Sequence, residues 1–177
     1  LICQWILILP APLFCQIVLS EIMFNPQGNE RHNEFIELWN QGSKPIDLCG
    51  WQLSDGDKTC SIIDAGHGCL LAPQQYAVVL LPDYEDNSTL YEHLIPKECL
   101  RITIDQATFG KSGFANSRNE TVSLLSPDSI TICSYTYLTP NPNGFSEEKI
   151  ILSEPNNPEN WGNSKRINGT PGHENSI

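Results

Sequence analysis

The chain is built from short apolar segments that alternate with turn-forming residues, and no long helical pattern lies between them. Successive side chains of a strand point to opposite faces, so a short run of alternating apolar and polar residues predicts a strand with one buried face. Such runs occur at residues 18–24, 34–39, 45–48, 52–54, 61–63, 76–81, 100–104, 121–125, 129–137 and 149–152. Strands at this spacing, without intervening helices, predict an all-β fold with a β-sandwich architecture.

Gly, Pro, Asn, Asp and Ser are concentrated between these runs, where they favour tight turns. After about residue 153 the chain is rich in Asn, Pro and Gly, and Trp161 is the only large aromatic residue. We therefore expect an irregular C-terminal tail that wraps the sandwich, with Trp161 as its hydrophobic anchor. The residues expected in or near the core are Ile22, Ile36, Leu38, Leu48, Trp51, Val79 and Leu124.

Four sequence blocks occur in a fixed order: EIMFNP from residue 21, EFIELWN from residue 34, DLCGWQLSDG from residue 47 and GTPGHENS from residue 169. Together they resemble the lamin tail domain family, in the form found on bacterial envelope and secreted proteins, over about residues 17–177. The resemblance implies an immunoglobulin-like β-sandwich used as a module, which specifies a fold rather than an activity. The matching signature residues, which it implies are structural, are Glu21, Asn25, Pro26, Glu34, Glu37, Asn40, Asp47, Leu48, Gly50, Trp51, Trp161, Gly169, Thr170, Pro171, Gly172 and Asn175.

Residues 1–16, LICQWILILPAPLFCQ, carry no charge and precede the first expected strand directly. This composition predicts a truncated secretion signal, cut after Cys15 or Gln16, and a domain that spans residues 17–177. Two alternatives stay open, a lipid anchor on Cys15 and an uncleaved anchor. The two prolines at positions 10 and 12 argue against a membrane-spanning helix, so no span is expected in the exported protein. The predicted location is outside the cell or in the envelope.

Residues 1–16 contain no Asp, Glu, Lys or Arg, so the formal net charge of −11 falls on residues 17–177. The Lys and Arg residues are scattered, and Lys165 with Arg166 is their only adjacent pair. Binding to nucleic acid needs a contiguous basic surface, so nucleic acid is not an expected partner.

Five cysteines remain if the predicted signal is removed, and five cannot all pair within one chain. Cys60 and Cys69 flank a turn-forming segment, so a disulfide between them is predicted, with buried free thiols as the alternative. Cys60, His67 and Cys69 could also supply three zinc ligands, but their spacing matches no usual zinc pattern. A bridged turn with a solvated histidine is the favoured interpretation.

Three glutamates lie on the first two expected strands. Side-chain alternation places Glu34 and Glu37 on opposite faces, and Glu21 could meet one of them across the ladder. Two close carboxylates would have raised pKa values or hold a cation. The favoured interpretation is structural: these carboxylates accept backbone N–H bonds from the loops at residues 25–29 and 40–44.

Two acidic segments are calcium candidates, because hard cations prefer flexible loops rich in oxygen ligands. They contain Asp83, Glu85 and Asp86 in one loop, and Asp55 and Asp57 in a turn. Neither has EF-hand spacing, so solvated turns are the favoured interpretation.

The chain has no nucleophile elbow and no phosphate-binding glycine loop. The sequence therefore predicts a non-catalytic secreted or cell-envelope module for binding, adhesion or scaffolding, without a cofactor. Its expected partner is an extracellular or envelope protein or a glycan, with calcium as an additional candidate. The alternatives are a small metal-dependent hydrolase that uses Glu21 and Glu37, or a calcium-dependent ligand-binding domain.

Overall fold

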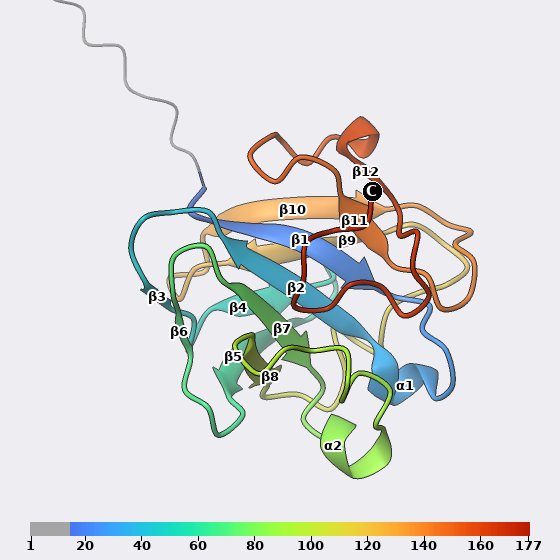
Figure 1. The fold of residues 1–177 in the computed structure, drawn as a ribbon, viewed down its shortest axis with the longest axis horizontal. Helices are drawn as coiled ribbons and strands as arrows, with labels where there is room; N and C mark the ends of the chain where they lie inside the picture. The colour runs from blue at the N-terminus through green and yellow to red at the C-terminus, as the bar shows by residue number, and fades with distance from the viewer. Residues whose placement is uncertain (1–14) are drawn as a thin grey trace, which may run out of the picture.

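The structure, a computed structural model, describes residues 15–177 (Figure 1). The strands are β1 (Ile17–Met23), β2 (Phe35–Asn40), β3 (Ile46–Asp47), β4 (Gln52–Ser54), β5 (Thr59–Asp64), β6 (Leu70–Leu71), β7 (Tyr76–Leu80), β8 (Leu100–Ile104), β9 (Glu120–Leu125), β10 (Thr131–Tyr137), β11 (Glu147–Lys149) and β12 (Trp161–Asn163). The described helices are short: α1 (Glu30–Asn33), α2 (Tyr84–Asn87) and the 3-10 helix η1 (Pro158–Asn160). The all-β prediction is confirmed.

Ten strands form one continuous sheet in the order β10-β9-β4-β5-β8-β7-β2-β1-β11-β12, and β3 pairs with β6 separately. Strand β5 joins two layers, because its first half pairs with β4 and its second half pairs with β8. The sheet curls at this strand, so that β10 lies close to β1 at the other side of the fold (Figure 1). The result is the sandwich that the strand spacing predicts.

The main core fills the space between the two layers. Phe24 stacks on Tyr137 with ring centroids 4.0 Å apart, which joins the end of β1 to β10. The expected core residues are fully buried, apart from Trp51, which is only partly buried and packs against the edge of the core. Those buried residues are Ile22, Ile36, Leu38, Leu48, Val79 and Leu124.

A second apolar cluster covers the outer face of β1, β2 and β7. Met23, Phe35 and Val78 point outward from these strands and pack beneath the segment that follows β7, which carries Tyr91 and Ile95. Phe35 and Tyr91 meet edge to face at a centroid distance of 5.1 Å. The sheet is therefore buried on both faces here, which explains why β1 and β7 read as nearly continuous apolar runs.

One prediction about the later strands was wrong. The expected strand at 149–152 lies instead at Glu147–Lys149, and its three polar side chains are all buried. Sequence alternation cannot find such a strand, because none of its residues is apolar. The expected irregular C-terminal tail is confirmed, because its regular elements are only the three-residue η1 and the three-residue β12, which Trp161 begins. Trp161 does anchor this segment, because it is buried and stacks on Tyr135 at 3.9 Å.

The predicted secretion signal lies outside the described residues, except for Cys15 and Gln16. These two residues contact the domain: the Gln16 side chain donates to the Lys44 carbonyl at 2.7 Å, and the Gln41 side chain donates to the Cys15 carbonyl. Within residues 15–177, no helix has the length and apolar character needed to cross a membrane.

Candidate functional site

Three buried glutamates form a row across neighbouring strands on the outer face of the sheet. Glu21 on β1 is in register with Glu37 on β2 and with Glu148 on β11. All three side chains are fully buried. The sequence prediction that Glu21 could meet a carboxylate across the ladder is confirmed for Glu37, and Glu148 is a third member that sequence reasoning missed.

The C-terminal segment 169–177 lies over this row and donates hydrogen bonds to it (Figure 1). The Thr170 amide donates to Glu21 at 3.0 Å, and the Thr170 hydroxyl donates to Glu148 at 2.8 Å. The Gly172 amide donates to Glu37 at 2.5 Å. Each of the three carboxyl groups therefore accepts a hydrogen bond from the backbone of the tail. We call Glu21, Glu37 and Glu148 together the tail clamp.

Ser20, Ser146 and Ser176 provide further donors to the same carboxylates. Their hydroxyl groups donate to Glu37, Glu21 and Glu148 respectively. Buried carboxylates require such donors, because an unpaired charge is costly in a low-dielectric interior. With these bonds, the carboxylates are saturated by donors from the chain itself.

The two glycines of the tail block are required by this close contact. Gly169 has a φ of +71°, and a Cβ atom there would lie 2.0 Å from Oε1 of Glu21. Gly172 has a φ of +81°, and its Cβ would lie 2.5 Å from a side-chain carbon of Pro96. Only glycine combines this backbone conformation with so little space. The two glycines of the GTPG block are therefore explained by the close packing of the tail against Glu21 and Pro96.

Burial changes the acidity of the clamp. Desolvation, followed by the nearby charge of Glu148, raises the pKa of Glu21 to about 8, although its hydrogen bonds act in the opposite direction. Desolvation and the charge of Glu21 also raise the pKa of Glu37 well above its ordinary value. The pair therefore holds protons at pH values where exposed glutamates are ionised.

Glu34 points away from Glu37, as predicted. It accepts a bond from the Phe114 amide at 2.8 Å and so holds the loop between β8 and β9. Desolvation raises the pKa of Glu34 to about 8. The prediction about the donors was wrong, because these glutamates bind the tail and the loop near Phe114 rather than the loops at 25–29 and 40–44. Those donors are distant in sequence, so no local pattern reveals them.

The other polar signature residues also bind backbone. Asn25 donates to the carbonyl of Asn141 at 2.8 Å, and Asn40 donates to the carbonyls of Lys44 and Leu71. Asn175 crosses from the tail to the carbonyl of Lys149 at 2.7 Å. Pro26 accepts a bond from the Asn143 side chain, Gly50 has a φ of +82° in the turn before Trp51, and Pro171 is buried within the tail. The signature as a whole holds loops and tail against the sheet.

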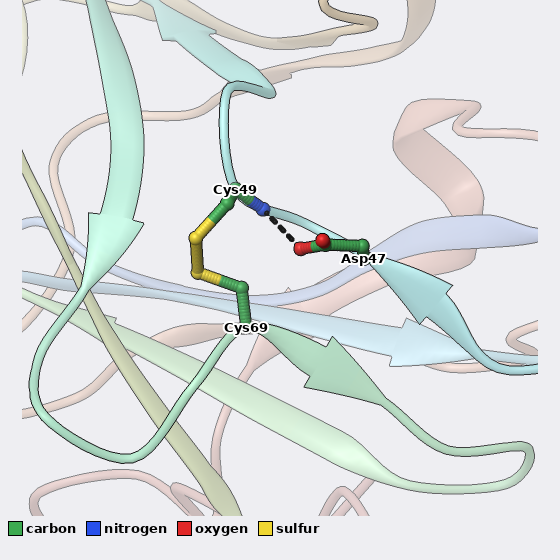
Figure 2. A group of neighbouring side chains, drawn as sticks. All are labelled: Asp47, Cys49 and Cys69. Atoms are coloured by element: carbon green, nitrogen blue, oxygen red, sulfur yellow. Dashed lines mark hydrogen bonds between the residues drawn. A yellow bond between two sulfur atoms is a disulfide. The ribbon is translucent and has the colours of Figure 1, made fainter.

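The disulfide in the structure joins Cys49 to Cys69, so the predicted bridge between Cys60 and Cys69 is wrong (Figure 2). Pairing of β3 with β6 brings Cys49 and Cys69 together at the ends of these strands, with a Cα separation of 5.4 Å. Cys60 instead points into the main core. The zinc candidate formed by Cys60, His67 and Cys69 is therefore not assembled.

Asp47 lies beside this disulfide and accepts a bond from the Cys49 amide at 3.0 Å (Figure 2). Among the residues that the structure describes, Asp47, Cys49 and Cys69 are the cluster of potential metal ligands that converge. Both sulfurs are used in the disulfide, so they are not available as thiolate ligands. Asp47 acts here as a cap of the turn that precedes Gly50.

The calcium candidates are spread out or already bonded. Asp55 accepts three backbone bonds, from Asp57, Lys58 and Lys111. Asp83 lies 3.0 Å from the imidazole of His32. Within residues 15–177, neither acidic segment brings three ligand groups together, and Glu85 and Asp86 are exposed on α2.

One surface groove has aromatic walls. It has a volume of about 510 Å³ and runs along β2, β7 and the tail. Trp39 and Tyr76 are half-buried cross-strand partners in its wall, with ring centroids 4.2 Å apart. Gln41, Gln74 and Asn175 add neutral amide groups, and the segment 149–153 with Glu174 and Ile177 completes the lining. We call this the Trp39–Tyr76 groove. Sequence reasoning did not single it out, because the segment 149–153 and the tail approach β2 and β7 only in the folded chain.

Comparisons with known proteins agree with this architecture. A comparison with curated proteins found no match. The protein-family profile described as Lamin Tail Domain matches residues 11–139, well over half of the chain. The match ends before β11 and the tail clamp donors, so the fold up to β10 carries it. The chain belongs to the lamin tail domain family.

Proposed function

We propose that the chain is a non-catalytic, exported recognition module that binds an extracellular glycan in the Trp39–Tyr76 groove. Its family and fold support a module of immunoglobulin type. The uncharged leader supports export to the cell surface or beyond. The observation that carries the choice of ligand is the lining of the groove, which combines aromatic rings with neutral amides.

The state of the carboxylates supports a module without catalysis. Glu21 and Glu37, which a metal-dependent hydrolase would need, are fully buried and bonded to the tail. A metal would have to displace the tail to reach them. General acid–base work also needs a carboxyl group within reach of a substrate, and these groups have no exposed surface.

The groove offers two kinds of contact that suit a sugar. The faces of Trp39 and Tyr76 provide apolar area beside polar tips, as aromatic residues do in ligand sites. The C–H faces of a pyranose ring pack on such rings. Amides both donate and accept hydrogen bonds, as sugar hydroxyl groups do. One N–H of Gln41 donates to the Cys15 carbonyl and one N–H of Gln74 donates to the Gln41 carbonyl, so each amide has a second N–H and an oxygen for a sugar hydroxyl group.

The backbone at Gln74 gives a further reason to assign a role to this side chain. Gln74 follows Pro73 with a φ of +57°, a conformation that favours glycine or asparagine. A glutamine in this position costs some stability, and such strain is common where a side chain has a function. Its side chain is exposed at the groove.

The charge of the protein argues for a neutral ligand. The chain has a net charge of −11, which repels acidic polymers such as nucleic acids. The charged residues of the groove lining are Lys149 and Glu174, one of each sign, so the lining has no formal net charge. A neutral glycan therefore fits the groove better than an acidic one. A protein partner is the competing class, and the test below distinguishes the two.

The test is calorimetric titration with peptidoglycan fragments, chitin oligosaccharides and β-glucan oligosaccharides. We expect at least one to bind, and we expect Trp39→Ala and Gln74→Gly to weaken binding about tenfold or more, the effect of losing a well-placed contact. Ile130→Ala is the control, since Ile130 is exposed at 62% and does not line this groove. Thermal unfolding of each variant checks that it remains folded.

Two results would overturn the proposal in different ways. If no glycan in the panel binds, the ligand class is wrong and a protein partner becomes the better proposal. If a glycan binds but Trp39→Ala leaves its affinity unchanged, the ligand class stands and the site is wrong. Export is tested separately, by finding the protein in the medium or envelope of a secreting host.

A further inference from the structure

The geometry points to a second disulfide, between Cys15 and Cys133, which closes the seam between β1 and β10. The structure holds both residues as thiols. Cys15 lies two residues before the start of β1, and Cys133 is the third residue of β10. The inference rests on the two cysteines and not on Trp39, Tyr76 or Gln74, although the groove that the cysteines line adjoins the Trp39–Tyr76 groove and shares Gln41 and Lys149 with it.

Both sulfur atoms lie against the same backbone oxygen. The Cys15 thiol donates to the carbonyl of Ile17 at 2.5 Å, and the sulfur of Cys133 is 3.9 Å from that oxygen. The two sulfurs are therefore neighbours, and little movement is needed to bring them to bonding distance.

The strands explain why the two cysteines meet. Cys133 shares a face of β10 with Tyr135 and Tyr137, whose rings point into the core, so its side chain also turns toward β1. The two strands are adjacent across the fold but are not hydrogen-bonded neighbours in the sheet. A covalent link here would join two strands that the backbone ladder leaves unconnected.

Both cysteines also line one surface groove of about 600 Å³, together with Lys149. A small oxidant can therefore reach them. The remaining thiols differ in this respect, because Cys60 and Cys99 are buried, and desolvation raises their pKa values to about 11 and about 12. The neighbouring Cys133 instead lowers the pKa of Cys15, whereas Cys15 and desolvation raise the pKa of Cys133, so Cys15 is the thiol that supplies the first thiolate.

The proposed bond forms by thiol–disulfide exchange with a small disulfide of the glutathione type. The Cys15 thiolate attacks one sulfur of that disulfide, forms a mixed disulfide and releases the first small thiolate. The Cys133 thiolate then attacks the sulfur of Cys15 and releases the second. The protein loses two hydrogen atoms, and the small disulfide is reduced to two thiols that take up the protons.

This pairing assigns each cysteine of the described residues to a disulfide or to a free thiol. Cys49–Cys69 and Cys15–Cys133 are the two bridges, and Cys60 and Cys99 remain as buried thiols. It also changes the expected processing, because Cys15 must stay in the mature chain. Signal cleavage would then fall before Cys15, rather than after Cys15 or Gln16, and a lipid on the Cys15 sulfur would be incompatible with the bridge.

The test is non-reducing peptide mapping of the full chain, secreted or incubated with oxidised glutathione and then alkylated. We expect a peptide pair that links Cys15 to Cys133, beside the pair that links Cys49 to Cys69, with Cys60 and Cys99 alkylated. In Cys133→Ser, Cys15 should become alkylated while the other bridge persists. The melting temperature of the oxidised chain should exceed that of Cys133→Ser, and the difference should disappear after reduction of both.

The bridge between Cys49 and Cys69 serves as the internal control for oxidation. If that bridge forms and both Cys15 and Cys133 are alkylated, the inference is overturned. Recovery of a secreted chain that begins after Cys15 would overturn it as well. A bridge from Cys15 to Cys60 or Cys99 would show that the observed proximity does not govern pairing, and would also count against it.

Discussion

Thr170 donates its amide N–H to the carboxyl group of Glu21, a residue 149 positions earlier in the chain, and its hydroxyl oxygen lies 3.2 Å from the same carboxyl group. This contact joins the last block of the sequence to the first strand. Glu21 is fully buried beneath the tail, so water can replace the contact with Thr170 only if the tail moves away. If the tail stayed in place without this contact, the buried carboxyl group of Glu21 would lose hydrogen bonds that water could not restore. The stability of the sandwich and the position of the tail are therefore coupled.

We predict that Gly169→Ala destabilises the protein by about 2–4 kcal/mol, because a methyl group there both meets Glu21 and strains a positive φ. Gly66→Ala is a matched control, since Gly66 has a φ of +96° with open space around it. It should cost only about 1 kcal/mol. Urea unfolding of the two variants measures the difference, and equal losses would show that the tail can move away from Glu21 freely.

The buried glutamates predict an unusual dependence of stability on pH. The pKa of Glu21 is about 8 in the folded chain against an ordinary value of 4.5, so the folded state binds a proton that the unfolded state has lost between these values. The contribution of this group is therefore fully present below about pH 4.5 and is lost as the pH rises toward 8. Glu34 acts in the same direction, with a pKa of about 8.

Urea unfolding at several pH values between 5 and 8 tests this expectation. The free energy of unfolding should fall as the pH rises, and Glu21→Gln should flatten the dependence. Glu159→Gln removes the same formal charge from the exposed η1 and should leave the slope as in the parent chain. A parent stability that is constant over this range would contradict the raised pKa values.

Trp161 and Trp51 should differ in their contributions to stability. Trp161 is 6% exposed and stacks on Tyr135, whereas Trp51 is only partly buried at the edge of the core. Trp161→Ala should cost about 3–5 kcal/mol, the range for emptying a buried aromatic site, and Trp51→Ala should cost less. Thermal unfolding of both variants decides the order, and the reverse order would show that the tail contributes little to the core.

Calcium should leave the melting temperature unchanged. Asp55 is bonded to three backbone amides, and the acidic residues around α2 do not converge on one point in the described chain. A ligand that binds only the folded state would raise the melting temperature by mass action. Thermal scans with and without about 10 mM calcium chloride, well above weak extracellular sites, test this, with magnesium as the control. A rise specific to calcium would restore the calcium hypothesis.

Much of the fold could be predicted from local patterns. Strands such as β4 and β8 begin and end at the residues that alternation and turn residues predict. A strand with one buried face has alternating apolar and polar residues, and this pattern can be recognised from neighbouring positions in the sequence. Strand β11 could not be found in this way. Its polar side chains are buried by contacts with the tail and with Tyr135, which come from distant parts of the chain.

The cysteine pairing shows a similar limit. Cys60 and Cys69 flank a turn and are close in sequence, yet Cys69 pairs with Cys49 because β3 and β6 align their ends. Disulfide formation depends on the separation and direction of two Cβ atoms, which the order of residues does not specify. The position of Cys15 beside Cys133 likewise arises only when the sheet curls.

The sequence alone determined the all-β class, the approximate strands and the glycines that permit close approach, since these depend on propensities and steric limits of individual residues. Only the tertiary structure decided that Glu21, Glu37 and Glu148 form one row, that the tail supplies their donors, and that Trp39 and Tyr76 line a groove with Gln74. The physical reason is that these contacts join residues far apart in the chain. Their energies depend on geometry and burial that exist only after the sheet has formed.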